Sequence, residues 1–109
     1  MANVFTNAKK DLTTNGVTTV YTVPASTTGI IKSILVSEDS GNADTVTLTL
    51  TDASANVFSL FKTKAVSANE TLELLSQPIV LQESEIIKAT AATGNRLHIV
   101  ISVLQINRE

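Results

Sequence analysis

The sequence predicts an all-β fold, namely a single-domain antiparallel β-sandwich of about seven to nine strands, jelly-roll or immunoglobulin-like. The first observation is composition: 16 Thr, 11 Val, 11 Leu and 9 Ile occur among 109 residues, and side chains branched at Cβ fit the pleated surface of a strand. The second is alternation of apolar and polar residues, and the third is turn signals at spacings of roughly 8–12 residues. At this length one domain is expected, residues 1–109.

The first clearly patterned strands lie in the N-terminal third of the chain. Residues 17–23 alternate up to Pro24, which closes the strand because proline cannot donate to a ladder. Residues 30–38 begin with apolar residues on both faces, as expected of a central strand that is covered on two sides.

The strongest strand signal is the segment Thr-Val-Thr-Leu-Thr-Leu-Thr at residues 45–51. Val46, Leu48 and Leu50 are expected to face the core and the threonines to face water, since the pattern has a period of two. The rest of the chain alternates between aliphatic segments and turn signals. It predicts further strands over residues 57–63, 71–75, 79–81, 85–91 and 96–106.

Short polar segments mark the expected turns. Asn15-Gly16 predicts a tight β-hairpin, because both residues tolerate a positive φ. Thr93-Gly94-Asn95 predicts a second hairpin loop, and residues 25–29 predict a loop. Turns are also expected at residues 40–42 and 52–56.

Charge and composition exclude several function classes. The net charge is −2 and the chain has no cysteine. A nucleic-acid binder would show a basic face, so no nucleic-acid partner is expected. No apolar run approaches the roughly 20 residues of a membrane span, so no membrane partner is expected. Without cysteine, disulfides, thiolate catalysis and zinc–thiolate sites are all excluded.

Residues that carry chemistry are sparse. His98 is the only histidine, and it alternates in phase opposite to Leu97 and Ile99, which places it on the solvent side. The acidic loop of residues 38–44 offers carboxylates of the kind that calcium binds, but it lacks the spacing of an EF-hand, and a solvated turn is expected. We therefore expect no enzyme activity, no catalytic residue, no cofactor and no metal.

Several segments together resemble a known group of proteins. They are residues 20–25 (Val-Tyr-Thr-Val-Pro-Ala), the aliphatic strand 29–36, and residues 58–62, 68–75, 79–82 and 86–89. The set spans residues 17–106 and resembles small all-β structural proteins of tailed bacteriophage virions. These include capsid decoration, or cement, proteins of cyanobacterial and marine phages.

The resemblance implies a non-enzymatic virion protein that is assembled in the host cytoplasm. Its leading form is a decoration protein that binds the outside of the major capsid shell and stabilises it. The implied partner is the major capsid protein or another virion protein. A homo-oligomer of the chain, such as a trimer, is also expected, because closed symmetry on a shell multiplies contacts. The alternative is a tail, neck or fibre component that recognises host glycans, with loop residues Asp39, Asn42 and Asn56 as sugar ligands.

The first ten residues are the least patterned part of the chain. One hypothesis is an N-terminal arm, residues 1–10, that lies on a neighbouring protein. In it Val4 and Phe5 are the apolar anchors, and Lys9 and Lys10 make polar contacts. The other hypothesis is a first edge strand of the sandwich.

Overall fold

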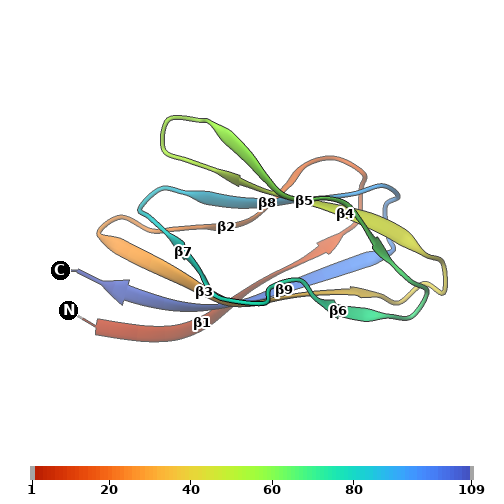
Figure 1. The fold of residues 1–109 in the computed structure, drawn as a ribbon, viewed down its shortest axis with the longest axis horizontal. Helices are drawn as coiled ribbons and strands as arrows, with labels where there is room; N and C mark the ends of the chain where they lie inside the picture. Colours follow the sequence, from red (N-terminus) through yellow and green to blue (C-terminus); the bar gives the residue numbers. More distant parts are fainter. Residues whose placement is uncertain (1, 109) are drawn as a thin grey trace.

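The structure, a computed structural model, describes residues 2–108 as two antiparallel sheets packed face to face (Figure 1). Met1 and Glu109, which belong to the predicted domain, lie outside the described residues. All nine elements formed by residues 2–108 are strands, which confirms the predicted all-β sandwich. Within residues 2–108, no helix is long and apolar enough to cross a membrane.

The strands divide between two layers. Sheet A, the lower layer in Figure 1, has the order β1-β9-β3-β6, and β7 also pairs with β3. Sheet B, the upper layer, has the order β2-β8-β4-β5. The strands of sheet A are β1 (Ala2–Leu12), β3 (Thr27–Glu38), β6 (Thr71–Glu73), β7 (Ile79–Leu81) and β9 (Leu97–Asn107). Those of sheet B are β2 (Thr18–Thr22), β4 (Asp44–Thr51), β5 (Val57–Val66) and β8 (Ile86–Ala91).

The pairing of the strands is nested. The first strand pairs with the last, β2 pairs with β8, β3 pairs with β6 and β7, and β4 pairs with β5. From β1 to β4 the chain crosses between the sheets at every connection. This rolled-up arrangement is the topology of a jelly roll rather than of an immunoglobulin-like sandwich.

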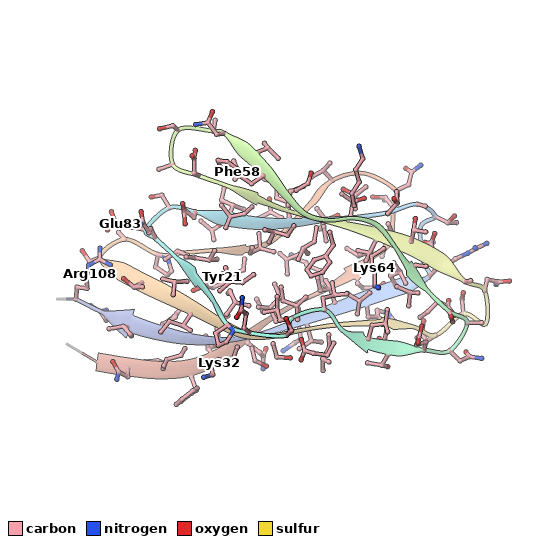
Figure 2. All side chains as sticks on the ribbon, viewed as in Figure 1. Tyr21, Lys32, Phe58, Lys64, Glu83 and Arg108 are labelled. Carbon is pink, nitrogen blue, oxygen red and sulfur yellow. The ribbon has the colours of Figure 1, made fainter. Side chains whose placement is uncertain are left out.

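The core lies between the sheets because each long strand turns an aliphatic face inward. On β9, Leu97, Ile99, Ile101 and Val103 are at most 1% exposed, as their alternation predicts. Val46 and Leu48 of β4 are fully buried opposite them, and Leu50 packs against the same core. Figure 2 shows side chains filling the space between the layers, with Tyr21 among them.

The prediction of two tight hairpins is wrong. Asn15-Gly16 lies between β1 and β2, and Gly94 lies between β8 and β9, yet in both cases the two strands belong to different sheets. These segments therefore form corners that cross from one layer to the other. The preference of these residue types for a hairpin turn is local. It is overridden here because the pairing of β1 with β9 buries Leu12 in the shared core.

Strand β3 begins at Thr27, three residues earlier than the sequence predicts, so that part of the expected loop at residues 25–29 is strand. The reason is pairing with β9, since Thr27 and Thr28 are the register partners of Asn107 and Ile106. The two sheets also approach each other closely at Gly29. A Cβ atom on Gly29 would lie 3.3 Å from the hydroxyl oxygen of Tyr21, and the missing side chain leaves room for the ring. Tyr21 in turn accepts a hydrogen bond of 2.8 Å from the side-chain amide of Gln105 on β9.

Candidate functional site

Strand β1 forms an edge of sheet A and contains the residues predicted to bind a partner. Residues Ala2 to Leu12 pair with β9 without a register shift, so this segment is an edge strand rather than a free arm. The pairing is stabilised because Leu12 is buried in the core and Ala8 packs against it. Contact of the predicted residues with a partner protein stays a prediction.

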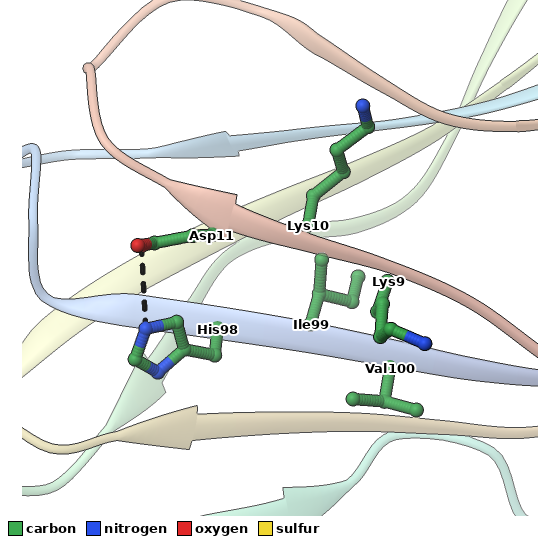
Figure 3. A pocket seen from close by; sticks show the side chains of 6 residues that line it. All are labelled: Lys9, Lys10, Asp11, His98, Ile99 and Val100. Atoms are coloured by element: carbon green, nitrogen blue, oxygen red, sulfur yellow. Dashed lines mark ion pairs between the residues drawn. The ribbon is translucent and has the colours of Figure 1, made fainter.

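The four predicted residues are all exposed on β1. Val4 is 48% exposed and Phe5 is 76% exposed, and Lys9 and Lys10 are exposed as well. Successive side chains of a strand point to opposite faces, so Phe5 and Lys9 lie on the outer face of sheet A. Val4 and Lys10 lie on the side of the sandwich interior. Figure 3 shows the two lysines pointing in different directions.

An apolar row crosses the outer face of sheet A. Phe5 on β1 is the register partner of Leu104 on β9, Leu104 is the partner of Ile30 on β3, and Ile30 is the partner of Val80 on β7. Phe5 and Val80, at the two ends, are 76% and 60% exposed, and the two central residues are half-buried. We call these four residues the outer row. Directly opposite side chains on one face of a sheet contact one another, so the outer row is a continuous apolar strip.

A shallow hollow lies beside the outer row. It is lined by Phe5, Asn7, Lys32 and Ser102, together with the neighbouring Thr6 and Val103. Figure 2 shows Lys32 projecting from the outer face of sheet A. An apolar strip next to a hollow with a cationic rim is the kind of surface that holds an apolar anchor and an acidic contact of a partner.

His98 lies on the outer face of sheet A, as predicted, between two carboxylates. Its Nε2 is 3.3 Å from Oδ1 of Asp11 (Figure 3). Its Nδ1 is 3.5 Å from Oδ2 of Asp39. Ser37 lies across from His98 on β3. Both ring nitrogens are directed at carboxylates, so neither is placed to accept a proton from the serine as a catalytic triad requires. The contacts of His98 with these two carboxylates join β1, β9 and the connection after β3.

Glu38 is the most enclosed carboxylate of the acidic loop, with 2% of the residue exposed. It accepts hydrogen bonds from the backbone N–H groups of Ser40, Gly41 and Asn69 at 2.8, 3.0 and 3.0 Å, and a further one from the Ser40 hydroxyl. Burial raises the pKa of this carboxyl, but the hydrogen bonds outweigh burial and lower the pKa from 4.5 to about 2. Glu38 therefore connects the loop that follows β3 with the loop between β5 and β6.

Replacing Glu38 with Gln is expected to lower the melting temperature by several degrees at pH 7, because the amide loses the charge-assisted hydrogen bonds. Since the pKa falls on folding from 4.5 to about 2, the stabilisation is complete above pH 4.5 and is lost as the pH falls toward 2. Melting curves of both proteins between pH 7 and 2 are therefore expected to converge in acid. Asp39→Asn removes the same charge from the next, exposed residue, and is expected to have the smaller effect at pH 7. Equal shifts for the two variants, or a gap that does not close in acid, would contradict this account.

The acidic loop does not gather its carboxylates around one point. Glu38 is saturated by protein donors, Asp39 faces His98, and Asp44 accepts a hydrogen bond of 3.0 Å from the backbone of Thr93. Among residues 2–108, no group of three or more His, Asp or Glu side chains is placed to hold a metal ion. The sequence alternative of a calcium loop is therefore not the arrangement in this structure.

The loop residues that were considered as sugar ligands lie at two different ends of β4. Asp39 and Asn42 precede the strand and Asn56 follows it. Each is engaged internally: Asn42 donates to the Ser40 carbonyl at 3.4 Å, and Asn56 donates to Asp52 at 3.3 Å. The structure therefore does not bring these three residues together.

Three members of the outer row were not recognised from the sequence. Ile30, Val80 and Leu104 lie in strands that were predicted, but each appears there as an ordinary apolar residue. Only the register of four strands shows that they share a face with Phe5. The available signal was that residues 30–38 carry apolar side chains on both faces, which indicates a second, outer apolar surface.

Comparison with known proteins identifies a fold relative only. No known protein family and no curated protein matches the chain. Among solved structures, the chain is similar to a protein described under "Bacillus endospore appendages form a novel family of disulfide-linked pili". The TM-score is 0.55 at 8% sequence identity, over 99% of this chain and 87% of the other. At this identity the likeness concerns the fold.

Proposed function

We propose that the chain is a non-enzymatic structural protein of a tailed-phage particle. Its proposed role is that of a decoration protein, which binds the outside of the capsid shell and stabilises it. The observation that carries the proposal is the outer row, because an exposed apolar strip of this kind marks a protein interaction site. The resemblance of residues 17–106 to phage structural proteins supports the setting. The fold likeness to a protein described as forming pili supports a role in assembly.

The outer row has the features of a docking surface. It is held on the rigid face of sheet A, so little conformational entropy is lost when a partner binds. Phe5 supplies an aromatic anchor at one end, 76% exposed, and aromatic residues are enriched among those that dominate binding energy. Lys32 beside the row would meet a carboxylate of the capsid surface and orient the contact.

Shell stabilisation follows from binding alone. A protein that binds the assembled shell and not its separated subunits stabilises the assembly by mass action. On a symmetric shell the same contact recurs at every equivalent position, so weak single contacts add up. The pili of the fold relative are described as disulfide-linked, whereas this chain has no cysteine. Contacts made by this chain are therefore not disulfide-linked.

The proposal is tested by charging the outer row. Val80→Asp is expected to weaken binding to purified particles that lack the protein by about tenfold or more, because it buries a carboxylate in an apolar contact. Val57→Asp is the matched control, since Val57 on β5 is 62% exposed and Val80 is 60% exposed, but Val57 belongs to sheet B. Cosedimentation with particles measures both. Equal binding by the two variants would show that the outer row is not the docking surface.

A further inference from the structure

The edges of the two sheets differ in how they are protected against pairing with another chain. Edge strand β5 carries Lys62 and Lys64 and pairs with β4 through two register shifts. Edge strand β2 is five residues long and has a register shift against β8. On the far side of sheet A, β6 and β7 have three residues each. Shortness, irregularity and lysines are the devices by which natural sheets block edge-to-edge association.

Strand β1 has none of these devices over most of its length. Its eleven residues pair with β9 without interruption. The segment Ala2–Ala8, which we call the open edge, contains no charged residue and no proline. Charges begin only at Lys9. Among the sheet edges within residues 2–108, the open edge is thus the one suited to accept a further strand.

Side chains are exposed on both faces of the open edge, so a strand added beside β1 would contact residues that a partner on the outer face does not reach. Phe5 is opposite Leu104 and lies on the outer face of sheet A. Val4 is opposite Gln105, whose amide reaches inward to Tyr21, so Val4 lies on the inner side. Both side chains are exposed, Val4 at 48% and Phe5 at 76%. A body docked on the outer face would cover Phe5 alone, whereas a strand beside β1 contacts side chains on both faces.

We propose that the open edge pairs with the open edge of a second copy, antiparallel and about a twofold axis at Phe5. This inference deepens the proposed function, because it states how copies join before they bind a shell. The axis places Phe5 opposite Phe5 of the second copy, Val4 opposite its Thr6, and Asn3 opposite its Asn7. Aromatic cross-strand pairs are among the favourable ones. The two outer rows then join end to end into one apolar strip across both copies.

Charge favours the second copy in this orientation. A parallel pairing would set Lys9 and Lys10 beside the same residues of the other copy. In the antiparallel register the two Lys9 residues are offset by eight positions, roughly 27 Å along the strands, and no charged residue faces the open edge. An edge that pairs with itself is an isologous contact, which closes at two copies. The proposed pairing therefore gives a dimer, in place of the trimer expected from the symmetry of a shell.

Cysteine cross-linking tests the register, because the chain has no cysteine of its own. Directly opposite Cα atoms lie about 4.5–5.5 Å apart, within the span of a disulfide. Phe5→Cys is expected to give a covalent dimer under mild oxidation, and Lys9→Cys is expected to stay monomeric on a denaturing gel. A mixture of Asn3→Cys and Asn7→Cys is expected to cross-link, while either alone is not. Cross-linking of Lys9→Cys but not of Phe5→Cys would overturn the register.

Sedimentation of the unmodified chain gives the second readout. The unmodified chain is expected to be a dimer at micromolar concentration. Phe5→Asp is expected to be a monomer. The control Phe58→Asp changes another exposed aromatic residue and is expected to remain a dimer. A monomer at all concentrations, with no cross-link at position 5, would overturn the inference. Abundant binding of that monomer to particles would leave the proposed function intact. A dimer that binds no particle would instead overturn the proposed function alone.

Discussion

Replacing Ile101 with alanine is expected to destabilise the protein by about 2–5 kcal/mol, the largest loss we expect from a single substitution. Ile101 is fully buried and faces sheet B from β9, which lies between β1 and β3. The lost methyl and methylene groups leave a cavity that three packed strands cannot close, so both the transfer energy and the cavity contribute. A domain of this size has a total stability of only about 5–15 kcal/mol.

The matched control is the neighbouring residue on the same strand. Val100 points to the outer face and is 36% exposed, so Val100→Ala is expected to cost about 1 kcal/mol or less. Urea unfolding of both variants measures the difference, provided that the unfolding free energy falls with urea concentration at the same slope in both. Similar losses at the two positions would mean that the inward face of β9 has been assigned incorrectly.

Gly94→Ala is expected to cost about 1–3 kcal/mol, although it adds one methyl group. The added Cβ would lie 2.5 Å from the carbonyl oxygen of Thr13, closer than any relaxed contact. The oxygen belongs to the backbone, and the two corners are tied together by a hydrogen bond of 2.9 Å from the Asn95 N–H to the Leu12 carbonyl. The backbone of both corners therefore has to move to make room for the methyl group.

Gly16→Ala is the control for this substitution. Gly16 lies in the same pair of corners, but its added Cβ would have Thr14 Oγ1 as nearest neighbour at 3.6 Å, an ordinary contact. Thermal unfolding is expected to show a lower melting temperature for Gly94→Ala, by about 4–8 °C per kcal/mol. A change at Gly16 as large as that at Gly94 would contradict the close packing of the corners.

The strands could be predicted from the sequence because alternation is a local property. Residues 45–51 show it directly, and the observed strand β4 lies at this position. Strand β1 could not be predicted with the same clarity, because its inward face includes Thr6 and Lys10 beside Ala8 and Leu12. Its eleven residues are held by pairing with β9, at the other end of the chain.

The strand partners and the surfaces that several strands share could not be predicted either, because both depend on pairing between segments far apart in the sequence. Asn15-Gly16 has the composition of a hairpin turn, but composition does not state which distant strand will cover Leu12. The outer row joins residues 5, 30, 80 and 104, which only the register of four strands brings together. The predicted anchors Val4 and Phe5 are both exposed on β1, but only Phe5 belongs to the outer row. Their role in binding stays a prediction.

The most direct test of the proposed role is the number of copies in a purified phage particle, measured by quantitative mass spectrometry against the major capsid protein. A decoration protein occupies equivalent positions over the whole shell, so copies on the order of hundreds are expected. About six to a few tens of copies would match the symmetry of a neck or tail instead. That result would contradict the assignment to the capsid surface.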